Sequence, residues 1–467
     1  MNKIVLNPVT RISGFMQIEA TLENNTVTQA RTDGMMFRGF ELMLKGRPPL
    51  DAVYFTERIC GICSSAHGTA SSTALEHVLG VEPKEQGKYL RDITHGCDFL
   101  QNHIRHFYQF VVPDYVKLPN VTPLLEAFGR DFRLPEPKNR QIAQHYFDSF
   151  AISRLSHTML AVMGGKAPHA HGIFVGGVTT MATVNMIIQL KSMVKQVMEF
   201  IESSMLPDTY TIAQYYNDYY NIGKGYDALM TYGCFNDYRS LGTLYVDPKT
   251  YLQGQIHPFD PEGITEATQH ARYGGPEVYT PTEVVVQPDA KKEGAYSWIK
   301  APRYFGLPYE VGPLARLWLA GEYDNGISTM DRIVARTLET RKIASIINTL
   351  LDHVIPGIVL QDTYTIPETA QGSGLVDTSR GALGHWMKIE DRLLSFYQII
   401  TPSAWNFSSQ TNTTPGPAEH ALLNTYVPDM NNPVELGRVV RSFDPCMSCA
   451  THVHIPGKGS TVWTVVP

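Results

Sequence analysis

The chain has 467 residues, of which 43% are hydrophobic and 18% are charged. This composition supports a large buried core and excludes an intrinsically disordered chain. The net charge of −6 gives no electrostatic reason to expect nucleic acid or an anionic membrane surface as a partner. No apolar stretch approaches the ~18–20 residues of a transmembrane helix, and the first residues lack the apolar core of a secretory signal. We therefore expect a soluble chain that reaches a membrane only through a partner.

The predicted elements, taken in chain order, are mostly helices. Residues 14–33 alternate around Asn24–Asn25, which predicts a β-hairpin. Residues 240–310 are rich in Gly, Pro, Tyr and β-branched residues, and we expect an irregular β-containing excursion there. Helical spacing of apolar residues predicts helices over about 84–112, 138–163, 181–222, 328–354 and 383–398. The expected fold is mainly α with small peripheral β-sheets (α+β), built as one interlocked domain over residues 1–452.

Four of the six cysteines form two CxxC pairs near opposite ends of the chain. Cys60 and Cys63 make the first pair, Cys446 and Cys449 the second, and each pair is followed within four residues by a histidine. A CxxC loop lets two thiolates converge on one metal ion, and a chain of this length does not need disulfides to fold. The two pairs predict one buried site at which the two ends of the chain meet.

Structural zinc or dithiol redox chemistry is the alternative for these cysteines. Zinc ribbons usually place two CxxC pairs about 15–20 residues apart, whereas here the pairs lie 446 − 63 = 383 positions apart. This separation argues against a zinc ribbon. Cys97 and Cys234 have no such partners, and we expect both to be buried apolar thiols.

The cysteine motifs resemble those of the large subunit of nickel–iron hydrogenases, RxCGxCxxxH near the start and DPCxxCxxH at the end. Six further segments resemble blocks of that family in the same order. They are 37–41 (FRGFE), 164–169 (GGKAPH), 300–304 (KAPRY), 310–316 (EVGPLAR), 380–386 (RGALGHW) and 402–406 (PSAWN). The resemblance covers nearly the whole chain. It implies the nickel–iron hydrogenase large-subunit fold and its activity, the reversible cleavage of H2.

The resemblance also implies a role for each cysteine of the two pairs. All four would bind nickel, Cys63 and Cys449 would also bridge to iron, and Cys60 and Cys446 would be terminal ligands. Soft thiolates suit these metals. The iron would carry carbon monoxide and cyanide, installed by maturation proteins, so this chain would supply no further iron ligand.

Further residues would surround the metals by the same resemblance. Arg380 would hold its guanidinium over the open nickel position, where a permanently charged planar cation can polarise bound H2. Asp114 and Asp444 would complete this canopy, Ser403 would donate to a cyanide, and His67 would donate to a bridging thiolate. Outside the motif, Arg380 would more often be a structural ion-pair residue and His67 a core histidine.

A magnesium ion is implied where Glu41 meets His452. Carboxylates are usual ligands of this ion, and histidine is a less common one. Lys300 and Glu310 are expected nearby as second partners of the magnesium site.

The chain departs from the family at residues 11–15, which read RISGF in place of RIEGH. Ser13 replaces the glutamate that would carry protons away from the nickel site. A serine hydroxyl relays a proton but cannot store one at neutral pH. We expect Glu57, three residues before Cys60, to substitute, and the alternative is an ordinary ion-pair residue. Ser379, where the family more often has proline, is a smaller change in the canopy wall.

The implied reaction is H2 ⇌ 2H+ + 2e−, with the proton passing to a terminal thiolate, Cys446, assisted by Arg380. Beyond the two CxxC pairs, no iron–sulfur ligand set remains in the sequence, so we expect an iron–sulfur small subunit as an obligate partner. The block pattern is closer to respiratory uptake enzymes, which favours membrane association through that partner.

Two other functional classes are alternatives to an uptake enzyme. A hydrogen-sensing regulatory hydrogenase would have the same metal site, and slow turnover beside a kinase partner would reveal it. A scaffold like the quinone-site subunit of respiratory complex I is disfavoured, because that subunit has lost the cysteines.

The chain continues for 467 − 452 = 15 residues after His452. The family is made as a precursor that is cut after its terminal histidine. We therefore expect residues 453–467 to be removed by a C-terminal endopeptidase, after a maturation chaperone has assisted metal insertion.

Overall fold

The N-terminal segment forms a three-stranded antiparallel sheet in the computed structural model, which describes residues 2–120, 131–284, 286–358, 360 and 363–450. The strands are β1 (Asn2–Leu6), β2 (Met16–Glu23) and β3 (Thr26–Gly34), in the order β1-β2-β3. Asn24 and Asn25 join β2 to β3 with φ values of 50° and 61°. Two successive positive φ values suit a tight hairpin turn. The hairpin therefore lies where the sequence places it.

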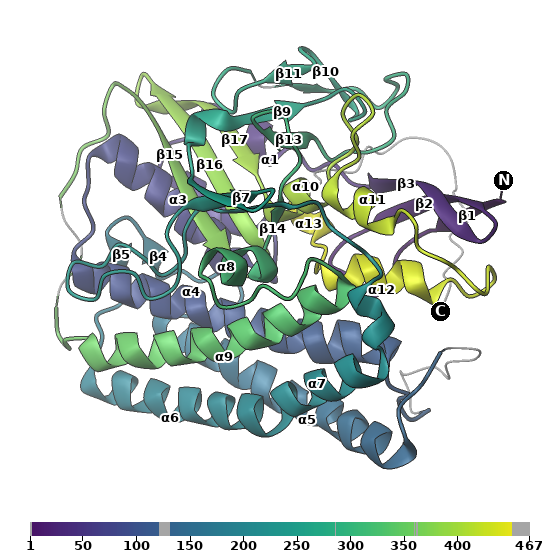
Figure 1. Ribbon diagram of the computed structural model, residues 1–467. Helices are drawn as coiled ribbons and strands as arrows, with labels where there is room; N and C mark the ends of the chain where they lie inside the picture. Colours follow the sequence, from purple (N-terminus) through teal and green to yellow (C-terminus); the bar gives the residue numbers. More distant parts are fainter. Residues whose placement is uncertain (1, 121–130, 285, 359, 361–362, 451–467) are drawn as a thin grey trace.

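A layer of long helices forms the other side of the molecule (Figure 1). α4 packs against both α5 and α9, and α6 packs against the same two helices. α4 continues into a π-helical segment, His106–Val111, and a short 3₁₀ turn, Val112–Asp114. The helices are α4 (Glu85–Arg105), α5 (Glu136–Gly164), α6 (Val184–Phe200), α7 (Leu206–Tyr215) and α9 (Thr329–His353). The helices predicted over 84–112, 138–163, 181–222 and 328–354 correspond to this layer.

The helix predicted over 383–398 is wrong, because this segment forms two strands. β15 (Thr369–Thr378), β16 (Gly381–Glu390) and β17 (Leu393–Ile400) make an antiparallel sheet in that order. α3 (Ser64–Leu79) packs on this sheet and leaves β16 buried along nearly its whole length. A strand buried on both faces shows no polar alternation, so its sequence is easily taken for a helix.

The segment between residues 228 and 311 forms several small sheets. β6, β7, β8 and β14 make one sheet, β9, β11 and β13 another, and β10 pairs with β12. These strands are β6 (Ala228–Thr231), β7 (Lys249–Leu252), β8 (Gln255–Pro258), β9 (Ile264–Ala267), β10 (Tyr273–Gly274), β11 (Val278–Tyr279), β12 (Gln287–Pro288), β13 (Ala301–Tyr304) and β14 (Glu310–Val311). A mainly helical fold with small sheets is therefore confirmed.

The two ends of the described chain lie side by side. Figure 1 shows α12 (Val434–Ser442) and α13 (Met447–Ala450) beside the N-terminal sheet. Ser13 pairs with Cys446 in an isolated parallel bridge. Its N–H donates to Pro445 O at 3.2 Å, and Met447 N–H donates to Ser13 O at 2.7 Å. The N-terminal segment thus fixes the C-terminal CxxC loop.

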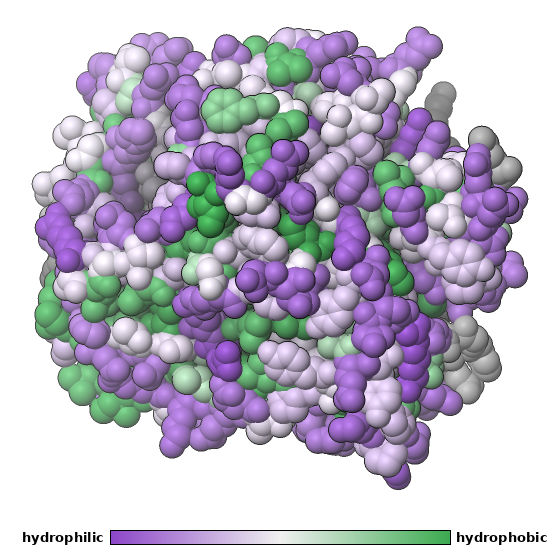
Figure 2. All heavy atoms as spheres, viewed as in Figure 1, coloured by the Kyte–Doolittle hydropathy of each residue, from purple (hydrophilic) through white to green (hydrophobic). Residues whose placement is uncertain are grey.

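The visible face in Figure 2 mixes polar and apolar residues. Apolar side chains gather toward its lower left, where Figure 1 places α6 with the exposed Val184 and Ile188. No helix in the part of the chain that the structure describes is long and apolar enough to cross a membrane.

Candidate metal centre

Two loops bring the four paired cysteines together. Cys60 and Cys63 lie between α2 (Asp51–Glu57) and α3, and Cys63 is the residue that caps the start of α3. Cys446 lies between α12 and α13, and Cys449 lies within α13. All four side chains are buried.

The four sulfur atoms converge on one point. They all lie within 4.8 Å of one another. Cys446 Sγ is 3.4 Å from Cys60 Sγ and 3.0 Å from Cys449 Sγ, and Cys63 Sγ is 3.2 Å from Cys449 Sγ. Free thiols at these distances would repel on ionisation unless a cation held them. The donor set is therefore that of a soft metal site.

A thiolate is favoured at Cys446. Hydrogen bonds from the thiols of Cys449 and then Cys60 lower the pKa of Cys446 well below its usual value, and the charge of Arg380 acts in the same direction. The thiolate is the form in which a cysteine binds a metal, so this direction agrees with a metal site.

Arg38 connects the two CxxC loops. Its Nη2 donates both to the carbonyl of Ile59, just before Cys60, and to the carbonyl of Ser448, just before Cys449. Arg38 belongs to the FRGFE block, but nothing in the sequence indicates its role. The structure indicates that it holds the two halves of the cysteine site in register.

Arg380 lies in the turn between β15 and β16 with one side of its guanidinium fixed. Its Nε donates to Asp444 O at 3.0 Å, and its Nη2 donates to Asn102 Oδ1 at 2.6 Å and to Asp444 Oδ1 at 3.1 Å. Nη1 is buried and has no hydrogen-bond partner among the described residues. An unpaired donor of this kind indicates a place where a further group binds.

The groups around Arg380 keep its guanidinium positively charged. Burial lowers the pKa of Arg380, but the fields of Asp444 and then Cys446 outweigh burial and hold the pKa well above its usual value. The thiols of Cys63 and Cys60 act in the same direction. The cation therefore lies within the field of the cysteine site.

Asp444 is held from several sides. Asn102 Nδ2 donates to its Oδ2 at 2.7 Å, and Arg336 Nη1 lies 3.3 Å from the same oxygen. Burial raises the pKa of Asp444, but Arg380, His106 and Arg336, together with the hydrogen bond from Asn102, outweigh burial and keep the pKa well below its usual value. Asn102 and Arg336 were missed by sequence analysis. The only sequence signal for their role is that they lie on the faces of α4 and α9 that are buried.

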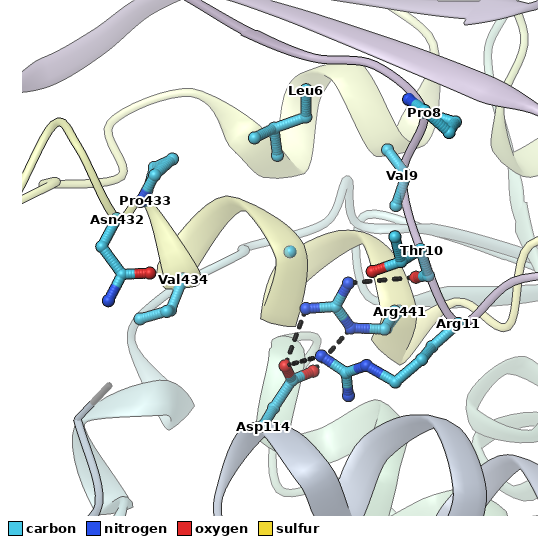
Figure 3. Close-up of a pocket in the computed structure, with 11 residues that line it drawn as sticks. Leu6, Pro8, Val9, Thr10, Arg11, Asp114, Asn432, Pro433, Val434 and Arg441 are labelled. Carbon is cyan, nitrogen blue, oxygen red and sulfur yellow. Dashed lines mark hydrogen bonds and ion pairs between the residues drawn. The ribbon is translucent and has the colours of Figure 1, made fainter. Parts of the chain in front are cut away.

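Asp114 belongs to a neighbouring cluster (Figure 3). Arg441 Nε donates to its Oδ2 at 2.6 Å, and Arg11 Nη2 lies 2.5 Å from its Oδ1. Both carboxylate oxygens are thus bonded to arginines other than Arg380. Arg441 precedes Asp444 by three residues on the way from α12 to the cysteines. Asp114 therefore anchors the approach to the second CxxC pair.

Ser403 and His67 lie close to the cysteine loops. Ser403, at the start of α10 (Pro402–Asn406), accepts the N–H of Cys446 at 3.0 Å. His67 Nδ1 lies 3.1 Å from His385 Nε2, and His385 Nδ1 lies 2.8 Å from Tyr397 OH. Burial lowers the pKa of His67 to about 4, so its imidazole is neutral. The ring is oriented through this buried chain.

Glu41 lies in α1 (Phe40–Leu44) at a second polar cluster. Its Oε1 accepts the N–H of Ile399 at 3.1 Å and lies 3.3 Å from Lys300 Nζ. The second carboxylate beside Lys300 is Glu266, at 3.0 Å, and its Oε1 is buried without a partner among the described residues. Glu310 pairs with Arg332 at 2.8 Å, and its expected place near the magnesium site stays a prediction.

His452 and residues 453–467 lie outside the described residues. A carboxylate pair with one unpaired oxygen nevertheless suits a divalent cation. Glu266 was missed because it lies far in sequence from Glu41 and shares no motif with it.

Glu57, the proposed substitute for the missing acid, is fully buried at the end of α2. Its Oε2 lies 3.3 Å from Arg58 Nη1, and its Oε1 has no partner among the described residues. Burial raises the pKa of Glu57 to about 8 despite the charges of Arg58 and Lys166. Ser13 Oγ lies 3.4 Å from Ser448 Oγ, beside the terminal cysteine loop.

Comparison with known proteins decides the family. A sequence model of the nickel-dependent hydrogenase family matches residues 38–127, 119–326 and 320–452. The chain belongs to the nickel-dependent hydrogenase family. The predicted enzyme class and the large-subunit fold are confirmed, and the zinc-ribbon alternative is set aside.

Named hydrogenase large subunits match nearly the whole chain. It is 34% identical to the periplasmic [NiFeSe] hydrogenase large subunit of Desulfomicrobium baculatum, over 97% of this chain and 95% of that one. It is 29% identical to the uptake hydrogenase large subunit of Bradyrhizobium diazoefficiens, over 97% and 96%. The Ni-Fe-Se hydrogenase structure from Desulfovibrio vulgaris Hildenborough superposes with a TM-score of 0.93 at 35% identity, covering 97% of this chain and 100% of that chain.

The residues of this hydrogenase fit a nickel–iron centre. Four thiol sulfurs lie together in a buried site, and the unpaired Nη1 of Arg380 belongs to the same site. All four positions are cysteine in this chain, although its relatives include selenium-containing enzymes.

Proposed function

We propose that this chain catalyses H2 ⇌ 2H+ + 2e− at the four cysteines beneath Arg380. The observation that carries the proposal is the buried cluster of four sulfurs next to a guanidinium with one unpaired nitrogen. Cys60, Cys63, Cys446 and Cys449 would hold nickel, with Cys63 and Cys449 also bridging to an iron that carries carbon monoxide and cyanide. When bound, this centre supplies the place where H2 is taken up and its electrons are accepted.

The chain itself supplies the groups that handle charge and the proton. Arg380 is held rigidly on one edge by Asp444 and Asn102, which leaves Nη1 to polarise H2 without reorganising. Cys446, the terminal ligand whose N–H is bonded to Ser403, would accept the proton as a thiolate. Asp114 would act indirectly. It would fix Arg441, and Arg441 would in turn position the segment that leads to Asp444.

Ser403 and His67 would complete the surroundings of the metals. Because Ser403 Oγ accepts the N–H of Cys446, its own hydrogen is left for donation to a cyanide. The neutral His67 can donate one N–H to a bridging thiolate while its other nitrogen faces His385.

A magnesium ion at Glu41 and His452 is a separate part of the proposal. Glu41 lies at a buried cluster in which Glu266 keeps one oxygen unpaired. Metal analysis of the processed protein before and after Glu41→Gln tests this site. Retention of magnesium by the variant would contradict the assignment.

Electrons must leave through a partner, because the sequence holds no further iron–sulfur ligand set. We propose an iron–sulfur small subunit, and membrane association through it, in keeping with the uptake name of the Bradyrhizobium relative. A maturation chaperone and an endopeptidase would act first, and the family match ends at residue 452. Mass spectrometry of the active protein should show the chain without residues 453–467, and an intact terminus would contradict processing.

An infrared spectrum of the processed complex tests the metal site directly. Bands in the window of metal-bound carbon monoxide and cyanide are expected, and Cys449→Ser should abolish them. A nickel-loaded protein without these bands would show that the cysteines hold a simpler metal.

A further inference from the structure

The neighbouring helices α3 and α4 both carry buried polar atoms without partners among the described residues. The structure as described leaves such atoms on Ser65, Thr69 and Ser72 of α3 and on His95, Gln101 and Arg105 of α4. Buried polar groups are nearly always paired, and groups without a protein partner require water. Six such residues on two neighbouring helices therefore mark a polar, water-binding seam.

The unpaired groups of α3 share one face. Ser65, Thr69, Ser72 and Glu76 follow one another at spacings of four, three and four residues, which aligns them along a helix. The opposite face of α3 packs on β15, where Gly374 approaches the backbone at Ala70. The polar stripe of α3 thus points away from the sheet.

The facing stripe of α4 has the same spacing. Arg91, His95, Asp98, Asn102 and Arg105 follow one another at four, three, four and three residues. Arg91 Nη1 lies 2.7 Å from Glu76 Oε1, which fixes one end of the two stripes against each other. Near the other end, the backbone N–H of Ala66 faces Asp98. The two stripes therefore run antiparallel and enclose the seam.

Asp98 connects the seam to the cysteine site. It is buried one helical turn before Asn102, the residue that donates to Asp444 and accepts from Arg380. The charges of Arg380, Arg105 and Cys446 all act on Asp98. The catalytic arginine and the seam thus share one electrostatic environment.

Glu57 connects the seam to the surface of the chain. Its Oε1 lies 2.7 Å from the position of a β-carbon at Gly68, so the glycine leaves room for this carboxyl beside α3. The charge of Asp98 acts on Glu57. The other oxygen of Glu57 faces Arg58, whose side chain is 42% exposed. The buried Glu57 therefore lies between the seam and the partly exposed Arg58.

We propose that the seam between α3 and α4 conducts protons between the cysteine site and Glu57, with Asp98 as the acid midway. The proposal rests on the proposed function and deepens it, because it gives the protons a route in a chain whose Ser13 cannot store one. Each proton arriving from the site forms an O–H bond on the Asp98 carboxylate. Asp98 then passes a proton through hydroxyls and water to Glu57, and returns to a carboxylate. No electrons move along this route.

The groups facing Asp98 are matched to that task. Burial raises the pKa of Asp98, Arg380 and Arg105 lower it, and the balance lies at about 7. Burial lowers the pKa of His95 to about 3, so this neighbour adds no charge. Serine and threonine hydroxyls both donate and accept, as a relay requires. A purely structural acid would instead be expected to end in a close ion pair.

The test compares Asp98→Asn with Asp98→Glu in the intact, metal-loaded complex. Asparagine keeps the shape but cannot carry a proton, so H2 oxidation should fall by about tenfold or more while the KM for H2 stays constant. Asp98→Glu should restore much of the rate. An infrared difference band of a protonated carboxyl, sensitive to D2O, should be present in the wild type and missing in Asp98→Asn.

Glu419→Gln is the matched control, because Glu419 is also a buried carboxyl with a pKa raised by burial to about 7. Its partners are the N–H groups of Thr32 and Gly416 and the OH of Tyr296, and none of them is a residue of the cysteine site, so turnover should not change. If Asp98→Asn does not fold, Thr69→Val serves instead. It removes an unpaired hydroxyl, so turnover should fall without loss of thermal stability.

Unchanged turnover in Asp98→Asn, with the carboxyl band retained, would overturn the route while leaving the hydrogenase assignment intact. A wild-type complex without H2 oxidation would instead refute the proposed function itself.

Discussion

At the scale of single residues, we expect Arg380 to support turnover through its Nη1 donor and not through its charge alone. Lysine would keep the charge, but its donors all lie on one nitrogen, so it cannot hold Asp444 and Asn102 along one edge while a second nitrogen faces the site. We predict that Arg380→Lys loads metals normally but lowers turnover by about 10²–10³-fold, the usual cost of losing one preorganised donor. H2-uptake assays with an artificial acceptor, beside the infrared spectrum, measure both effects.

Arg392→Lys is the control for Arg380→Lys, because Arg392 makes an exposed ion pair with Glu368 at 3.0 Å. Exposed pairs contribute little, so this variant should behave like the wild type. Wild-type turnover in Arg380→Lys would show that charge alone suffices.

At the same scale, the raised pKa of Glu419 predicts how the stability of the protein depends on pH. Burial raises its pKa from 4.5 to about 7, so the folded state holds this proton more tightly than the unfolded state. Stability therefore falls as pH rises through that window, by about 3 kcal/mol at this one position. Glutamine does not ionise, so Glu419→Gln should gain stability relative to the wild type between about pH 4.5 and 7. Denaturant unfolding at several pH values measures the gap, and a constant gap would contradict the prediction.

At the scale of elements, α3 and β15 approach each other through a glycine. A β-carbon at Gly374 would lie 2.1 Å from Ala70 O and 2.6 Å from Ala74 N, both backbone atoms that cannot move aside. We predict that Gly374→Ala lowers the free energy of unfolding by about 1–3 kcal/mol or more. Gly274→Ala is the control, since a β-carbon there meets no atom within 4 Å. Equal unfolding midpoints for the two variants would show that β15 can shift away from α3.

The packing of α3 on this sheet also explains why the sequence does not predict strand β16. A helix with a solvent-facing side, such as α6, shows its period in the sequence, and the Asn24–Asn25 turn predicts its hairpin. β16 is covered by α3 and shows no period. Its turn at Asp391 and Arg392 adopts two positive φ values without the usual glycine. Tertiary burial, not local preference, makes this segment a sheet.

At the scale of the whole molecule, the cysteines were predictable because motifs mark them, whereas their supporting residues were not. Asn102 and Arg336 come from α4 and α9, far apart in sequence, and only the folded chain brings them to Asp444. Arg38 and Ser13 show the same principle, since each ties the first eighth of the chain to the second CxxC loop. The cysteine site thus connects the N-terminal and C-terminal segments of the chain.

Because this site connects the two ends of the chain, the stability of the folded protein should depend on nickel. Metal that binds only the folded state stabilises it, and four thiolates from both ends of the chain exist as one site only when the ends are docked. We predict that protein from nickel-depleted cells unfolds at a lower temperature than loaded protein, and that strand β1 and helix α12 lose hydrogen-exchange protection first. The buried helices α4 and α9 should keep theirs, because they pack on each other without contribution from the cysteines. Equal unfolding temperatures and equal protection in both forms would show that the ends are docked by the protein alone, with Arg38 and the Ser13–Cys446 pairing sufficient to hold them.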